Sequence, residues 1–167
     1  MLRFTALAAG LTLLTGGVAA AQAPVSPPAA ASSPSPAVAA GALFLATNAK
    51  APGVVVLPSG LQYKIVASGP KTAESPKIGD IIKVHYEGKL LDGTVFDSSF
   101  ERNQPAIMPL DGLVQAWLEA LPMMHVGDEW VLYVPAELGY GDRDVGPIPA
   151  GSVMVFRLKL LGMLSVD

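Results

Sequence analysis

Aromatic side chains recur in the second half of this chain at positions where they could line one pocket. The aromatic members of the set are Tyr86, Phe96, Trp117, Tyr140 and Phe156. Few polar groups stand among them, and Asp97 follows Phe96 directly. Flat apolar walls of this kind suit an apolar ring and strip water from the groups beside it. Chemistry at such a site depends on shape and desolvation, because the set contains no nucleophile with its base.

The arrangements that usually support metal or covalent chemistry are missing from the sequence. His85 and His125 belong to no metal-ligand spacing such as HExxH. Ser98 and Ser99 lack the G-x-S-x-G context of a nucleophile elbow. No glycine-rich phosphate loop is present. We therefore expect no metal and no cofactor.

Short strands separated by turn residues must position the aromatic set. Apolar and polar residues alternate over 61–66, 82–87, 130–134 and 154–160, as in half-buried strands. Asp92-Gly93 indicates a hairpin. Between Leu113 and Leu121 the apolar spacing is helical, and Pro122 discourages continuation. The pattern predicts an α+β fold, an antiparallel sheet of five to six strands wrapped around one short α-helix.

The N-terminal part has a different composition. Residues 1–21 combine a single charge, Arg3, with an apolar run and a small-residue exit, which is typical of a signal peptide cleaved after Ala21. A retained membrane anchor is the alternative, although the apolar run is short for a span. Residues 22–42 are rich in Pro, Ala and Ser and predict a disordered linker. Residues 43–56 form a lead-in with one or two helical turns, and 57–167 form the folded domain.

The net charge bears on the kind of partner, and the cysteine content bears on the cellular compartment. The chain has 11 Lys and Arg against 14 Asp and Glu, a formal net charge of −3, which argues against nucleic acid. It has no cysteine, so disulfides say nothing about where it works. The predicted signal peptide therefore indicates the compartment. We expect an exported protein of the bacterial periplasm, with no membrane span once the signal peptide is removed.

The order of the pocket residues resembles the FKBP-type peptidyl-prolyl cis/trans isomerases over roughly 57–166. The motifs that carry the resemblance are VHYEG at 84–88, FDSS at 96–99, LVQAW at 113–117, GYG at 139–141, IP at 148–149 and VF at 155–156. The resemblance implies an FKBP-like fold and an enzyme that rotates X-Pro bonds in exported polypeptides as they fold. It also implies that macrolide inhibitors bind.

The resemblance assigns roles residue by residue. Trp117 would be the floor beneath the proline ring, and the walls would be Tyr86, Phe96, Leu113, Val114, Ile148 and Phe156. The backbone N–H of Val114 would meet a substrate carbonyl. Asp97 and Tyr140 would contact the twisting amide as the catalytic polar groups, with Trp117 beneath it. Arg102 would brace the carboxylate of Asp97.

Three departures from the family pattern leave a second interpretation open. Ala106 stands where an aromatic residue is often found, and Ala116 where a glycine usually precedes the tryptophan. The loop over 142–146 lacks the histidine seen in some relatives. The alternative is a catalytically weak binding or chaperone module for unfolded clients. Some exported members dimerise through a long helical N-terminal extension. The Pro/Ala/Ser-rich segment in its place predicts a monomer.

Overall fold

The computed structural model describes residues 35–166 of the chain. The predicted signal peptide and most of the predicted linker lie outside these residues. Among the helices of 35–166, none is both long enough and apolar enough to cross a bilayer.

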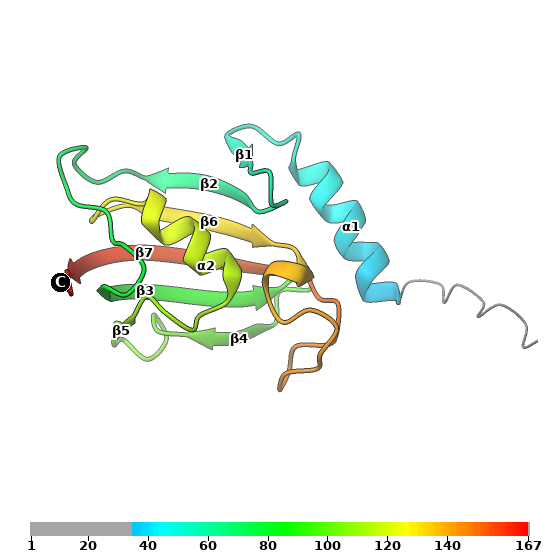
Figure 1. Cartoon of the computed structure of the whole chain (residues 1–167). Coiled ribbons are helices and arrows are strands. Elements are labelled where there is room, and N and C mark those ends of the chain that lie inside the picture. The colour runs from blue at the N-terminus through cyan, green and yellow to red at the C-terminus, as the bar shows by residue number, and fades with distance from the viewer. Residues whose placement is uncertain (1–34, 167) are drawn as a thin grey trace, which may run out of the picture. The chain divides into compact units, whose positions relative to one another are not determined.

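The strands of the described residues form one antiparallel sheet (Figure 1). Its strands are β1 (Val54–Val56), β2 (Gln62–Ala67), β3 (Ile81–Leu90), β4 (Val95–Ser98), β5 (Ala106–Pro109), β6 (Glu129–Val134) and β7 (Met154–Leu164). They lie in the order β1-β2-β6-β7-β3-β4, and β5 also pairs with β3. The α+β class and the antiparallel sheet are confirmed. The strand count is seven because the short β1 and β5 also join the sheet.

The alternating segments of β3, β6 and β7 place their apolar residues on the face that packs against the core, as predicted, whereas Ile65 in β2 is 47% exposed. The fully buried residues of the central strands are Ile82 and Val84 in β3, Leu132 and Val134 in β6, and Met154, Leu158 and Leu160 in β7. The β3–β4 hairpin turns at Asp92-Gly93, where Gly93 has φ +90°. That positive φ is the conformation for which glycine was expected there.

The short helix α2 (Gln115–Ala120) covers this inner face of the sheet (Figure 1). It buries Ala116, Trp117 and Ala120. A 3-10 turn over Leu121–Met123 follows, because Pro122 has no N–H with which to continue the α-helical bonds. The single helix wrapped by the sheet is therefore the element that the sequence predicted.

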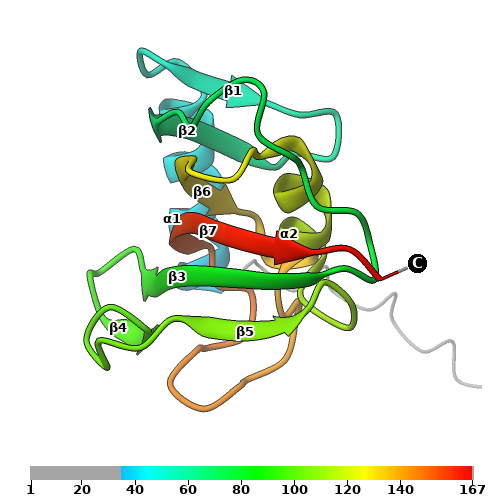
Figure 2. The same ribbon diagram turned by 90° about the vertical axis from the view of Figure 1, so that its left-hand side faces the viewer.

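A longer helix than expected lies on the other side of the sheet. Helix α1 covers Pro36–Asn48, so residues 36–42 of the predicted linker are helical. The Ser35 side chain caps its first turn, and Pro36 stands at a position where proline is well tolerated. Figure 2 shows α1 and α2 on opposite sides of the sheet.

Helix α1 changes the environment of β2. Gln62 was expected on the polar face of its strand, yet it is only 4% exposed. Its side chain accepts a hydrogen bond from Asn48 Nδ2 and donates one to Leu45 O, both at 2.9 Å. The amide is thus buried with its hydrogen bonds satisfied.

Candidate functional site

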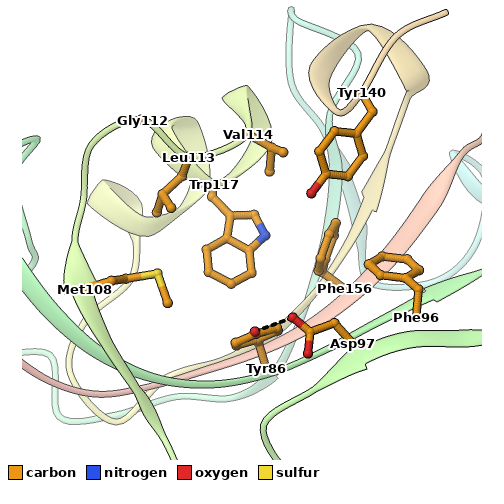
Figure 3. A pocket seen from close by; sticks show the side chains of 10 residues that line it. All are labelled: Tyr86, Phe96, Asp97, Met108, Gly112, Leu113, Val114, Trp117, Tyr140 and Phe156. Carbon is orange, nitrogen blue, oxygen red and sulfur yellow. Dashed lines mark hydrogen bonds between the residues drawn. The ribbon is translucent and has the colours of Figure 1, made fainter. Parts of the chain in front are cut away.

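A pocket of about 290 Å³ opens where α2, the sheet and the loop after β6 meet. Its lining residues are Tyr86, Phe96, Asp97, Met108, Gly112, Leu113, Val114, Trp117, Tyr140 and Phe156. Figure 3 shows the aromatic rings arranged around the indole of Trp117. The volume fits a small apolar ring with a few atoms on each side.

Trp117 is positioned by aromatic neighbours on the inner face of the sheet. Its ring meets Tyr86 edge-on at 5.2 Å between centroids and Phe156 at 5.5 Å. Phe96 in turn meets Phe156 edge-on at 5.6 Å. Edge-to-face contacts at these distances are favourable and define the ring orientations. The indole is only 5% exposed, so it forms a fixed floor.

Gly88 makes room for two of the pocket walls. A Cβ atom there would lie 2.5 Å from Phe96 Cε2 and 2.8 Å from Phe156 Cε1. Real Cβ atoms do not approach other atoms so closely. The glycine in β3 therefore allows both rings to pack directly on the strand.

Asp97, Tyr86 and Arg102 form the polar edge of the pocket. The Tyr86 hydroxyl donates a hydrogen bond to Asp97 Oδ2, and Arg102 Nη1 pairs with Asp97 Oδ1. Arg102 Nη2 also lies 3.1 Å from the Tyr86 oxygen. The guanidinium of Arg102 therefore contacts both the carboxylate of Asp97 and the hydroxyl of Tyr86.

These contacts shift the acidity of both pocket groups. Partial burial raises the pKa of Asp97, but the hydrogen bonds from Tyr86 and Arg102 and the charge of Arg102 outweigh it and hold the pKa below 3.8. Burial, followed by the hydrogen bond to Asp97, raises the pKa of Tyr86 above 10.0. At neutral pH the pocket therefore presents a carboxylate and a neutral phenol.

Ser99 holds the strand that carries Tyr86. Its Oγ accepts a hydrogen bond from Tyr86 N at 2.7 Å, and its own N–H donates to Tyr86 O at 2.8 Å. His85 Nδ1 contacts the same Oγ at 2.9 Å, and the His85 ring stacks on Phe100. The contacts of His85 therefore support a structural role, and no group of three or more potential ligand side chains in residues 35–166 could hold a metal ion.

Tyr140 reaches the pocket from the loop between β6 and β7. Gly141 N donates to Ala136 O at 2.8 Å, which closes the turn that presents the ring. In Figure 3 the Tyr140 hydroxyl points into the pocket, above Trp117 and opposite Asp97. The two groups expected to contact an amide thus approach from different sides.

The structure brings most of the expected residues together but changes the set in two ways. Ile148 is not among the residues that line the pocket, although, like Trp117 and Phe156, it belongs to the buried core cluster. Met108 and Gly112 line it instead. Met108 lies two residues after Ala106 on the same half-buried face of β5, and this alternation was the signal that could have identified it.

Leu113 and Val114 lie where the chain enters α2. Val114 is the residue before the first helical position, and its O accepts hydrogen bonds from Trp117 N and Leu118 N. The first N–H groups of a helix have no acceptor within that helix. The position therefore suits a donor to a bound carbonyl.

The sheet folded on one short helix, with an aromatic pocket between them, defines an α+β domain with an apolar site open at its surface. A family model described as "FKBP-type peptidyl-prolyl cis-trans isomerase" matches residues 72–161. A second, "Domain amino terminal to FKBP-type peptidyl-prolyl isomerase", matches residues 20–65. The chain belongs to the FKBP-type peptidyl-prolyl cis-trans isomerase family.

Individual relatives agree with this assignment. The chain is 46% identical over 125 residues to the "FKBP-type 22 kDa peptidyl-prolyl cis-trans isomerase" of Escherichia coli. The matched region covers 74% of this chain and 60% of the relative. It is 44% identical over 124 residues to "Outer membrane protein MIP" of Legionella longbeachae, covering 74% and 52%. The crystal structure of FkpA from Escherichia coli superposes with a TM-score of 0.74 at 36% identity, over 78% of this chain and 61% of that one. The chain thus spans about half the length of the curated relatives.

Proposed function

We propose that this protein is a peptidyl-prolyl cis/trans isomerase that accelerates X-Pro rotation in exported polypeptides as they fold. The observation that carries the proposal is the aromatic pocket around Trp117, with Asp97 and Tyr140 at its edge. Membership of the isomerase family and the names of its relatives support it.

The barrier to be lowered is electronic. Rotation of a peptide bond costs ~18–20 kcal/mol because the planar resonance must be broken. An acceleration of about four decades requires lowering this barrier by ~5.4 kcal/mol. No covalent intermediate is needed for a change of this size.

In the proposed mechanism the proline ring rests on Trp117 between Tyr86, Phe96 and Phe156. Enclosure removes water from the carbonyl of the rotating X-Pro amide, which belongs to the residue before proline, and water favours the more dipolar planar amide. A pocket that fits the twisted amide better than either planar form lowers the barrier further. A carbonyl of the bound substrate accepts a hydrogen bond from the backbone N–H of Val114.

The polar groups have separate roles in the proposal. Asp97 stays ionised beside Arg102 and faces the twisting amide, whose nitrogen becomes more pyramidal and basic as resonance is lost. Tyr140 contributes a hydroxyl from the opposite side. Tyr86 holds the carboxylate in position through its hydrogen bond.

The test is a protease-coupled or NMR-exchange isomerisation assay on the full chain, with proline-containing peptides and a slowly refolding protein as substrates. Trp117→Ala should remove most of the turnover, and Asp97→Ala a substantial part. Folding of each variant is checked by circular dichroism, because Trp117 also belongs to the core and its removal costs about 3–5 kcal/mol. Trp117→Phe, which keeps an aromatic floor, should retain more activity than Trp117→Ala.

The alternative is a binding module with slow turnover. Ala106 motivates it, because a small residue stands there in place of the aromatic residue often found in the family. A well-folded chain that binds unfolded clients without accelerating exchange would support this alternative. Normal turnover in both Trp117→Ala and Asp97→Ala would contradict the assigned site.

Export is part of the proposal. The signal-peptide pattern of residues 1–21 supports it, as does the name of the Legionella longbeachae relative, "Outer membrane protein MIP". Protein recovered from the bacterial cell envelope should begin at Gln22 by mass spectrometry. A chain that retains Met1 there would instead favour the membrane-anchor alternative.

A further inference from the structure

The loop that carries Tyr140 packs against α1. This loop, residues 135–153, joins the end of β6 to the start of β7. Gly151 N donates to Gly141 O at 2.9 Å, so the far end of the loop is bonded to the residue next to Tyr140. Any element that fixes Gly151 therefore acts on the peptide that presents the Tyr140 ring.

Helix and loop meet at two glycines. Gly41 is the buried residue of α1, and a Cβ there would lie 2.7 Å from Val153 Cγ2. On the loop side, a Cβ on Gly151 would lie 2.4 Å from Val38 Cγ2. Gly151 also has φ +72°, which side-chain-bearing residues rarely adopt. Val38 and Val153 thus each pack onto the bare backbone of the opposite element.

The sheet holds α1 independently of the loop. Gln62 of β2 is hydrogen-bonded to Asn48 and to Leu45 O near the C-terminal end of α1. Phe44 packs against Tyr133 of β6, with ring centroids 5.8 Å apart. One face of α1 is therefore fixed to the sheet while Val38 and Gly41 contact the loop.

We propose that α1 is a positioning element of the pocket: its contact with Gly151 and Val153 sets the place of Tyr140 above Trp117. Helix α1 lies outside residues 72–161, which the isomerase family model matches. Its effect on turnover rests on the proposed function. Its effect on Tyr140 is structural and can be measured without any activity.

The first experiment follows Tyr140 by NMR in the full chain, with tyrosine rings labelled with ¹³C and the signal assigned by Tyr140→Phe. Gly41→Ala inserts a methyl group against Val153 and should shift the Tyr140 signal. Gly41→Ala combined with Val153→Ala removes the overlap and should restore it. Leu43→Ala is the matched control, because Leu43 lies on the same helix with 71% of its surface exposed.

Val38→Ala tests the contact without creating an overlap, in case Gly41→Ala impairs folding. It should also shift the Tyr140 signal, with a smaller change at Tyr63 on β2, which does not line the pocket. If neither Gly41→Ala nor Val38→Ala moves the Tyr140 signal in a folded chain, the proposal is wrong.

The second experiment is a double-mutant cycle on turnover. Gly41→Ala should raise KM about threefold or more, with less change in kcat. In a chain that already carries Tyr140→Ala, Gly41→Ala should raise KM little further, because the effects of residues coupled through one backbone shift are not additive. An equal loss in both backgrounds would show that α1 acts only on overall stability. If the Tyr140 signal shifts but the wild-type chain has no activity, the proposed function fails while the positioning role stands.

Discussion

The Tyr86 hydroxyl lies between Asp97 and Arg102 and hydrogen-bonds both. It donates to Asp97 Oδ2 and lies 3.1 Å from Arg102 Nη2. Asp97 and Arg102 are half-exposed, with 42% and 51% of their side-chain surfaces accessible. An exposed ion pair alone contributes little to stability. The phenol therefore matters because it fixes where the carboxylate points.

Removal of this hydroxyl should reduce turnover without removing the wall. Tyr86→Phe keeps the ring against Trp117 but takes one donor from Asp97. One hydrogen bond to a partly exposed charged group is worth about 1 kcal/mol, so kcat/KM should fall about fivefold. Tyr133→Phe, a tyrosine on the opposite face of the sheet, is the control and should leave kcat/KM unchanged. Equal turnover in wild type and Tyr86→Phe would contradict a role for this contact.

The acidities of Asp97 and Tyr86 predict a broad pH plateau. The lowered pKa of Asp97 gives stability that is present above its ordinary value of 3.8 and is lost as pH falls through the lower folded value. The raised pKa of Tyr86 gives stability that is present below 10.0 and is lost as pH rises through the higher folded value. Both kcat/KM and Tm should stay level between these limits.

A pH profile of kcat/KM checks this plateau. Tyr86→Phe should remove the part of the fall in kcat/KM at alkaline pH that comes from ionisation of Tyr86. A change of kcat/KM within the plateau would contradict this prediction.

Gly88 should be intolerant of a methyl group. Gly88→Ala would push Phe96 and Phe156 into the pocket, and overpacking of this kind costs about 1–3 kcal/mol. KM should rise about tenfold. Gly162→Ala in β7 is the control, because its Cβ would meet no atom within 4 Å. Similar KM values for both variants would show that the two rings can move aside.

The protein should be monomeric. Helix α1 has 13 residues and is about 20 Å long, which is short for a helical dimerisation arm. Sedimentation velocity of the full chain at several concentrations should give one species of monomer mass. A dimer that persists on dilution would refute this, and Leu43→Asp on the exposed side of α1 would then test whether the helix forms the interface.

Local patterns were sufficient for the framework of this protein. Period-two alternation identified the inward faces of β3, β6 and β7, because side chains alternate strictly across a strand. Asp92-Gly93 located the hairpin, since its turn needs a positive φ. Trp117 was placed on the short helix by spacing alone. The order of the motifs indicated the family, and the contact between Asp97 and Arg102 is one that the family resemblance led us to expect.

Only the tertiary structure decided which residues meet across elements. Gln62 is buried because α1 lies over the end of β2, which no alternation within 61–66 could show. Met108 lines the pocket because strand pairing brings β5 beside β3, and Ile148 is buried in the core cluster without being one of the lining residues. A sequence pattern gives the face on which a side chain lies. Its neighbours depend on strand register and on packing between distant segments, and these exist only once the chain has folded.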